Sequence, residues 1–369
     1  MIYLDWNATT PLAEEVVRAM TAALSEAWGN PSSVHRAGRD ARAKVEDARA
    51  AIGQALGFDP RDVVLTGGGT ESNNLALVSM VGPRGTLVTS RLEHPSITRV
   101  ADALEAAGVA VHWTTPAPDG RIDPQAVDAL LRDAAPGPRL VTVTAVNHET
   151  GVVQPVAELA EVAHRHGAVL HVDAVQALGK IEPDFFEAAD LISIAAHKLR
   201  GPKGIGALAV RPRFKLRPVL RGGAQEKGVR PGTVDPVAAV GFGVAVSRAG
   251  GGPGRYRSVA ALRDRLEAAL VLRGALRNGE AARAPHVANV SFSAWRGPEL
   301  AAALDLEGVC ISSGSACSAG TAEPSPVITA MLGEARATSA IRLSLGDTSD
   351  EREVLDVIAA FDRVLTRGA

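Results

Sequence analysis

The sequence predicts an α/β fold: a mostly parallel, seven-stranded sheet covered by helices on both faces, joined to a smaller α+β domain. From about residue 62 to 210, short apolar runs rich in β-branched residues alternate with helix-like segments. Such runs are typical of strands buried on both faces of a parallel sheet. A cluster of glycines and a proline at 250–254 then separates this region from shorter elements, and 369 residues suit about two domains.

The expected elements of the large domain follow from these runs. The seven expected strands are 63–65, 86–88, 109–111, 140–143, 169–172, 191–194 and 205–210. The clearest helix-like segments between them are 72–81, 95–107, 124–132 and 155–166. Because sheets of this kind bind ligands at the carboxyl ends of their strands, functional residues are expected there.

The remainder of the chain is expected to contain an extended loop and the smaller domain. Residues 217–233 are rich in glycine, arginine and proline and lack periodicity, which indicates a loop. The elements expected after it are helices at 238–248 and 256–273, a strand at 287–292, a helix near 299–306, a Ser/Gly-rich loop at 312–325, a strand at 340–344 and a helix from 350. The predicted division is a large domain, 13–250, and a small domain made of 1–12 and 251–369.

Composition excludes several classes of protein. The 39 Lys and Arg balance 41 Asp and Glu, so there is no basic footprint for nucleic acid. No apolar stretch approaches the roughly 18 residues of a membrane span, and the first residues lack the pattern of a signal peptide. The two cysteines, Cys310 and Cys317, are too few for a disulfide framework. No Cys/His spacing indicates a metal site. The sequence therefore favours a soluble, cytoplasmic protein.

Three features could carry chemistry at strand ends. The turn 67–74, GGGTESNN, follows a strand and opens a helix, so its amides and hydroxyls could hold a phosphate; alone, it could equally be a tight turn. Asp173 ends an apolar strand, where it could cap the next turn or hold a protonated pyridine nitrogen. Lys198 ends another, and could either reach solvent or form a Schiff base.

The order of these features along the chain favours one cofactor. The chain has only 6 lysines against 33 arginines, so a lysine at a strand end is worth noting, since arginine cannot form a Schiff base. A phosphate-binding turn, a buried acid and a strand-end lysine on one parallel sheet together suit pyridoxal 5'-phosphate (PLP). The sequence therefore predicts a PLP enzyme.

The motifs resemble those of a known family, and the match runs nearly end to end. The motifs are DWNATTP (5–11), GNPSS (29–33), GGGTESNN (67–74), Glu93-His94, VDAVQ (172–176), HKLRGPKGIG (197–206) and SSGSAC (312–317). Together they resemble the cysteine desulfurases of the NifS/IscS branch. The resemblance implies a fold-type I, class V aminotransferase-like homodimer that binds PLP. It also implies conversion of L-cysteine to L-alanine with transfer of sulfur to the enzyme.

The resemblance assigns roles in binding the cofactor. Lys198 would form the internal Schiff base, Asp173 would hold the ring nitrogen and Gln176 the ring hydroxyl. His148 occupies the position of an asparagine that contacts the ring, and its imidazole can also donate a hydrogen bond. The phosphate would be held by Gly69, Thr70, His197 and, from the facing subunit, Thr233.

The resemblance also assigns the reacting groups. His94 would stack on the ring and take part in proton transfer, and Cys317 would accept the sulfur as a persulfide. Its small-residue loop would give that thiolate the mobility it needs. Cys310, between Val309 and Ile311, instead suits an inert small hydrophobic residue. Substrate would be bound by Asn30 and Arg342, the latter through a bidentate contact to the carboxylate.

Two positions depart from the family's pattern besides His148. Ala195 stands where a phosphate-binding Ser or Thr is usual, so Ser193 or Thr70 would have to compensate. Few residues follow the final helix, where some relatives use a longer tail to dock a scaffold protein. The sulfur acceptor therefore stays open among iron–sulfur cluster assembly, tRNA thiolation and cofactor thiolation.

Alternative functions on the same fold are a selenocysteine lyase, another class V aminotransferase and a non-catalytic binding subunit. An aminotransferase would need no mobile cysteine, and a lyase would prefer selenium strongly over sulfur. A non-catalytic subunit would have no physical reason to keep Lys198, Asp173, His94 and Cys317 together. These differences favour the desulfurase.

Overall fold

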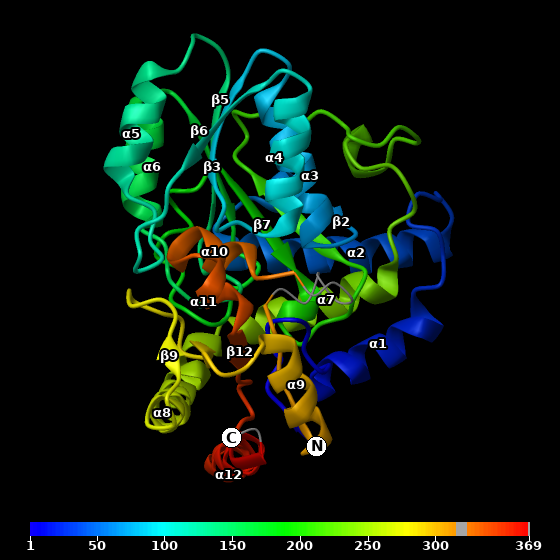
Figure 1. Ribbon diagram of the computed structural model, residues 1–369. Coiled ribbons are helices and arrows are strands. Elements are labelled where there is room, and N and C mark those ends of the chain that lie inside the picture. Colours follow the sequence, from blue (N-terminus) through cyan, green and yellow to red (C-terminus); the bar gives the residue numbers. More distant parts are fainter. Residues whose placement is uncertain (315–322, 368–369) are drawn as a thin grey trace.

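The computed structural model describes residues 1–314 and 323–367, and its central element is a seven-stranded sheet (Figure 1). The strand order is β2-β8-β7-β6-β5-β3-β4. The strands are β2 (Val63–Thr66), β3 (Thr86–Ser90), β4 (Ala110–Thr114), β5 (Arg139–Thr144), β6 (Val169–Asp173), β7 (Leu191–Ala195) and β8 (Gly206–Val210). Only β8 runs against its two neighbours. The predicted mostly parallel sheet is confirmed, and all seven expected strands are present.

Helices cover both faces of this sheet, as Figure 1 shows. On one side lie α3 (Gly69–Val81) and α4 (Pro95–Ala106). On the other lie α5 (Pro124–Asp133) and α6 (Val156–Arg165). Each side has its own apolar core. Both faces of the strands are therefore buried, which explains why they read as continuous apolar runs rather than alternating ones.

Side chains and prolines fix where several helices begin. His94, Asp123 and Asp235 each accept a hydrogen bond from a backbone N–H of the first turn of α4, α5 and α7 (Pro236–Ala249). Each of these three helices has a proline in its first turn, where no hydrogen bond is lost. The cap at His94 matters for the site, because it fixes one nitrogen of an imidazole that faces the cavity.

Two helices at the start of the chain have no counterpart among the expected elements. They are α1 (Glu14–Glu26) and α2 (Arg36–Leu56), which pack against α7 and extend the larger core. The glycine cluster also differs from expectation, because α8 (Gly252–Val271) begins inside it. A Cβ at Gly252 would lie 2.0 Å from Gly179 O, so a glycine there allows the backbone to approach.

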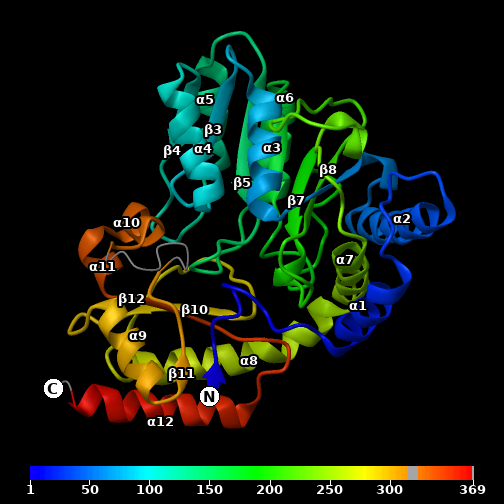
Figure 2. The ribbon, with the colours of Figure 1, turned by 90° about the vertical axis from the view of Figure 1, so that its right-hand side faces the viewer.

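The rest of the chain forms a smaller half, below the sheet in Figure 2. Its strands form the sheet β12-β10-β9 and the pair β1-β11. The bounds are β1 (Ile2–Tyr3), β9 (Leu276–Arg277), β10 (Val287–Ser291), β11 (Val309–Cys310) and β12 (Ala340–Ser344). They pack with α8, α9 (Gly297–Leu306) and α12 (Glu351–Arg367) around a separate core that includes Leu4.

Two short helices, α10 (Pro326–Leu332) and α11 (Glu334–Thr338), contribute instead to the core of the large half. Apart from these two helices, the separate cores support the predicted division, 13–250 against 1–12 with 251–369, which we propose to keep. No helix in the described part of the chain is both long and apolar enough to cross a membrane.

Candidate functional site

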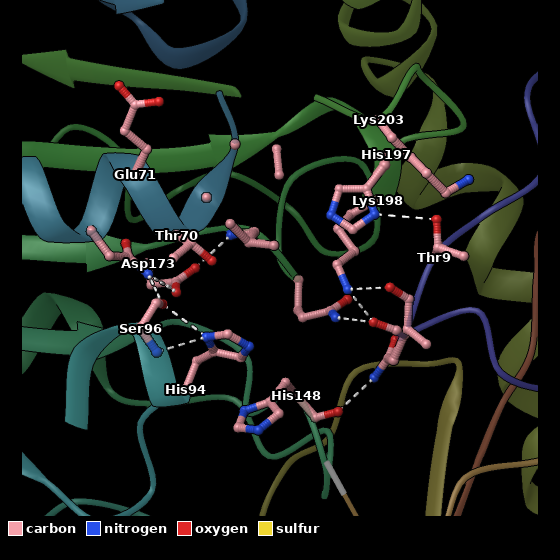
Figure 3. A pocket seen from close by; sticks show the side chains of 18 of the residues that line it. Thr9, Thr70, Glu71, His94, Ser96, His148, Asp173, His197, Lys198 and Lys203 are labelled. Atoms are coloured by element: carbon pink, nitrogen blue, oxygen red, sulfur yellow. Dashed lines mark hydrogen bonds between the residues drawn. The ribbon is translucent and has the colours of Figure 1, made fainter. Parts of the chain in front are cut away.

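A cavity of about 750 Å³ lies at the carboxyl ends of the parallel strands, between the two halves of the chain. Residues that directly follow β2, end β5 and β6 and end β7 line it, together with the N-terminal segment and Arg342 of β12. Figure 3 shows Asp173, His94, His148 and Lys198 arranged around one space. This is the place at which sheets of this kind bind ligands, and its size suits a cofactor with a small substrate.

One end of the cavity is built for an anion. Gly67, Gly68, Gly69 and Thr70 line it where α3 begins, so the free amides of the helix N-terminus face the ligand space. The turn is held by Glu71, which also lines the cavity and accepts a hydrogen bond from Gly67 N at 2.6 Å. No other group in this turn carries a charge. The turn therefore supplies N–H and hydroxyl donors rather than a cation.

Asp173 begins a chain of hydrogen bonds that ends at His94. Its Oδ1 accepts from Val175 N at 2.9 Å and its Oδ2 from Asn73 Nδ2 at 2.8 Å. The same Asn73 amide donates to Ser96 Oγ at 2.8 Å, and Ser96 Oγ lies 2.8 Å from His94 Nδ1. Burial raises the pKa of Asp173, and these donors oppose that rise. The carboxylate is thus held in place for a cationic partner in the cavity.

The same contacts set the protonation of His94. Ser96 N donates to His94 Nδ1, so Nδ1 is an acceptor and the neutral ring carries its hydrogen on Nε2. Burial lowers the pKa of His94 to about 4, and the charge of Lys198 acts in the same direction. His94 is therefore a neutral imidazole near pH 7.

Lys198 reaches the cavity from a short 3-10 turn, Ala196–Lys198, that directly follows β7. Its Nζ donates to the backbone oxygens of Asn7 and, at 2.8 Å, Ala8. The same N-terminal segment contacts His197, whose Nδ1 lies 3.2 Å from Thr9 Oγ1. The segment thus holds the amine with uncharged oxygens rather than with a carboxylate.

Asn7 connects several of these groups. Its backbone oxygen also accepts from Gln176 Nε2 at 2.9 Å. Its side-chain Nδ2 donates to His148 O at 3.0 Å, and its Oδ1 lies 2.9 Å from His286 Nε2. The side chain is buried. Asn7 therefore ties the loop that carries His148 to the turn that carries Gln176.

Arg342 projects from β12 of the small half into the cavity. It donates to His148 O at 3.0 Å and to Asp5 Oδ1 at 2.6 Å. Its Nε is buried without a partner among the described residues. Asp5 therefore fixes one edge of the guanidinium, and an unpaired N–H is left that could bind a carboxylate.

His148 is the least satisfied polar group of the site. It is 7% exposed, and in the described part of the chain neither ring nitrogen has a hydrogen-bond partner. Its ring meets that of His94 edge-on, with centroids 5.2 Å apart. Burial lowers the pKa of His148 well below its ordinary value. A ligand in the cavity would supply what these nitrogens lack.

The structure brings together most of the residues that the sequence singled out. Those that line the cavity are Gly69, Thr70, His94, His148, Asp173, Gln176, His197, Lys198 and Arg342. Asn30 and Thr233 do not line the cavity of their own chain and are exposed. Their predicted roles stay predictions. Cys317 lies outside the described residues.

Some site residues were not given a role from the sequence. Asn73 and Ser96 connect Asp173 to His94, and Asn7 and Lys203 also line the cavity. Asn73 and Asn7 stand inside quoted motifs, which was the only signal for them. Ser193 cannot compensate for Ala195, because its hydroxyl lies 2.9 Å from His171 Nε2, away from the cavity. Thr70 remains as the hydroxyl donor.

Cys310 has the character of an unreactive thiol. It lies on β11, and its Sγ is 3.7 Å from Asp305 Oδ1. Burial and the negative charge of Asp305 both raise the pKa of the Cys310 thiol. Because the thiolate is the nucleophile, this environment disfavours reaction.

The cavity fits PLP. Polar atoms of His148, Arg342 and Asn73 are buried around it without partners among the described residues. An anion site, an acid and an amine line the same space, which matches the phosphate, pyridine nitrogen and aldehyde of that cofactor.

Comparisons with known proteins agree with the fit of the cavity to PLP. The family model Aminotransferase class-V matches residues 2–357. A cysteine desulfurase of Cereibacter sphaeroides is 40% identical over 96% of this chain and 92% of its own length. The cysteine desulfurase NifS of Azotobacter vinelandii is 37% identical over 97% of this chain and 90% of its own. The chain belongs to the cysteine desulfurases of the class-V aminotransferase family.

Solved structures place the fold in the same family. A NifS-like protein superposes with a TM-score of 0.91 at 29% identity, covering 99% of both chains. A NifS-like protein of Rickettsia africae gives 0.90 at 30% identity over 99% of both chains. A third structure, SspA in complex with cysteine, gives 0.79 at 33% identity over 94% of this chain and 99% of its own. Cysteine desulfurases are PLP enzymes in general, which agrees with the cavity.

Proposed function

We propose that this chain binds PLP in the cavity and transfers sulfur from L-cysteine to Cys317, as a sulfurtransferase acting in the cytoplasm. The observation that carries the proposal is the convergence of Lys198, Asp173 and Arg342 on one cavity. In the overall reaction the Cβ–S bond of cysteine breaks and its sulfur moves to the enzyme thiol, so that cysteine and R–SH give alanine and R–S–SH. Every atom is accounted for, and no external oxidant is needed.

The residues would divide the binding of cofactor and substrate. Lys198 would hold the cofactor covalently, Asp173 its ring nitrogen, and the start of α3 with His197 its phosphate. Arg342, steadied by Asp5, would bind the substrate carboxylate through its unpaired Nε–H. When bound, PLP supplies an electron sink for charge developing at the substrate's Cα.

Proton transfer falls to groups with defined protonation. The neutral His94 presents a hydrogen on Nε2, since Nδ1 is occupied by Ser96. It would therefore donate a hydrogen bond through Nε2 rather than a proton in its resting state, because loss of that hydrogen would leave an imidazolate. Lys198, once released from the cofactor, would be the amine that accepts a proton from the substrate.

The experiment compares wild type with Cys317→Ala and Cys310→Ala, with L-cysteine and a reductant. We expect wild type and Cys310→Ala to form alanine and sulfide. Cys317→Ala should form neither, while keeping the visible absorbance of bound PLP. If Cys317→Ala makes alanine as fast as wild type, Cys317 is not the sulfur acceptor.

The same assay separates the alternatives. A large preference for selenocysteine would favour a lyase, and turnover only with a keto acid would favour an aminotransferase. Absence of any visible absorbance from bound PLP would favour a non-catalytic subunit.

We further propose a homodimer and a protein acceptor for the sulfur. The support is that Thr233 and Asn30 lie exposed, away from the cavity of their own chain, so contact with a cavity would have to come across a subunit boundary. The acceptor would be an iron–sulfur scaffold or a sulfur carrier for tRNA or cofactor thiolation. Equilibrium sedimentation tests the dimer: a monomer at micromolar concentration would contradict it.

A further inference from the structure

A second lysine is buried directly behind the site. Lys180 is 2% exposed and lies on the turn after β6, four residues beyond Gln176. Its Nζ donates a hydrogen bond to Gln176 Oε1 at 2.7 Å. Among the residues that the structure describes, this is its only hydrogen bond. Burying an amine is costly unless it is well partnered, and a methionine would fill similar space without that cost.

The surroundings of Lys180 disfavour a charged amine. Burial lowers the pKa of Lys180 well below its ordinary value, and the charges of Lys198 and Arg342 act in the same direction. The imidazoles of His286 and His197 are also within electrostatic reach. A protonated Lys180 would have three N–H donors for one acceptor. The contact that carries its effect on the site is the hydrogen bond that it donates to Gln176 Oε1.

That donor is one of two contacts that orient the Gln176 amide. A glutamine amide can exchange its oxygen and nitrogen by a half turn. Here Lys180 places an N–H at Oε1, and Asn7 O accepts from Nε2 at 2.9 Å. A reversed amide would set two oxygens against each other at Asn7. Both contacts therefore favour the same orientation, and Gln176 lines the cavity with a second Nε2 hydrogen to offer.

We propose that Lys180 is a positioning residue, which holds the Gln176 amide so that its N–H donates to an oxygen anion bound in the cavity. The inference rests on the proposed function, in which that oxygen is the ring hydroxyl oxygen of PLP. Lys180 does not touch the cofactor in this arrangement. It acts only through Gln176, in the same way that Asn73 acts on the cavity through Asp173.

The test uses Lys180→Met, which keeps the length of the side chain but removes the donor, and Lys215→Met, an exposed lysine, as the matched control. The readouts are the PLP dissociation constant, the pH at which the visible absorbance of bound PLP changes, and thermal unfolding of the cofactor-free protein. We expect Lys180→Met to bind PLP about fivefold more weakly, the effect of one hydrogen bond.

The absorbance change should move to higher pH in Lys180→Met, because the ring oxygen loses a donor that stabilises its anionic form. Lys215→Met should change neither quantity. A purely structural role would lower the unfolding temperature without moving the pH of the absorbance change. Lys180→Gln, which keeps an N–H donor, should recover most of the wild-type behaviour, and it carries the test if Lys180→Met does not fold.

A double-mutant cycle with Gln176→Met decides whether Lys180 acts through Gln176. We expect the double variant to match Gln176→Met alone in affinity and in pH profile, since the effects of coupled residues do not add. Additive effects would overturn the proposal, and so would a Lys180→Met protein that binds PLP as wild type does. A wild-type protein that binds no PLP would overturn the proposed function itself, and this inference with it.

Discussion

Buried histidines in this chain differ in whether protein atoms satisfy their nitrogens. His171 is fully enclosed on β6, with Nδ1 2.8 Å from Thr142 Oγ1 and Nε2 2.9 Å from Ser193 Oγ. His148 is almost as buried, yet neither ring nitrogen has a hydrogen-bond partner among the described residues, and Glu149 Oε1 lies 3.6 Å from Nε2, beyond hydrogen-bond distance. The cost of leaving such groups unpaired is high. His171 therefore belongs to the core, and His148 marks a place where a ligand completes the structure.

The buried acid Glu93 gives a testable prediction about the pH dependence of stability. Burial raises the pKa of Glu93 to about 8, and Asp173 adds to the rise. Because this folded-state pKa lies above the unfolded value, Glu93 stabilises the fold fully below pH 4.5 and progressively less as the pH rises towards about 8. Glu93→Gln resembles the protonated acid, so it should be more stable than wild type by about 1–3 kcal/mol at pH 8.

Urea unfolding of wild type and Glu93→Gln between pH 5 and 9 measures the difference in their free energies of unfolding. The gap between Glu93→Gln and wild type should widen with pH. A constant gap would mean that Glu93 is not protonated in the folded protein.

Replacing Asn73 tests whether its hydrogen bond helps to hold the Asp173 carboxylate in place. Asn73→Ala removes the donor to Asp173 Oδ2 and the donor to Ser96 Oγ. The pKa of Asp173 should then rise further, since burial is left less opposed. We expect PLP binding about tenfold weaker, from one charge-assisted hydrogen bond, measured by titration of the cofactor-free protein. Unchanged affinity would show that Val175 N alone holds the carboxylate.

Among the elements, the turn before α3, which we propose to bind phosphate, depends on close packing between α3 and the sheet. Gly206 of β8 faces Gly68, so that a Cβ at Gly206 would lie 2.7 Å from the Gly68 carbonyl carbon. Backbone atoms cannot yield as a flexible side chain would. This close packing therefore fixes the position of the start of α3, so that its amides face the cavity.

Gly206→Ala should displace this turn. We expect a loss of about 2 kcal/mol of unfolding free energy, typical of overpacking, together with weaker binding of PLP and of inorganic phosphate. Gly254→Ala in α8 is the control, because a Cβ there meets nothing within 4 Å and should raise helix stability slightly. If Gly206→Ala binds PLP as wild type does, the turn tolerates the shift and the close approach does not set affinity.

Elements with a strong local signal could be predicted, and those fixed by distant contacts could not. The strands could be predicted because both of their faces are buried, which gives continuous apolar runs in the sequence, as at Val169–Asp173. The start of the helix inside the glycine cluster could not be predicted, since Gly252 is needed there for a contact with Gly179, 73 positions earlier. Asp173 and Lys198 were found because strand ends are predictable. Lys180 was not, because its role depends on a hydrogen bond and on burial.

At the scale of the whole molecule, a buried acid connects the segments that meet around the site. Asp347 follows β12, and its side chain is 1% exposed. It pairs with Arg200, two residues after Lys198, with Arg248 at the end of α7 and with Arg255 of α8. Arg200 has a φ of 64°, a conformation that non-glycine residues rarely adopt. The pairing holds the loop of Lys198 against the small half.

Asp347→Asn should therefore weaken the whole fold. Burial alone would raise the pKa of Asp347, but Arg248 and the other guanidiniums overcome it and lower the pKa. The stabilisation is thus present above the unfolded value of 3.8 and is lost as the pH falls through the lower folded value. Near pH 7 we expect Asp347→Asn to lose about 3 kcal/mol, because three partly buried guanidiniums lose the counter-charge of a buried carboxylate.

Urea unfolding at pH 7 and at acid pH, beside the exposed Asp356→Asn, provides the measurement. The difference between Asp347→Asn and wild type should shrink in acid, where wild type loses the same charge, whereas Asp356→Asn should match wild type throughout, as expected for an exposed side chain. A loss that persisted unchanged in acid would mean that Asp347 acts by its shape and hydrogen bonds. In that case its charge would not be what connects the loop of Lys198 to the small half.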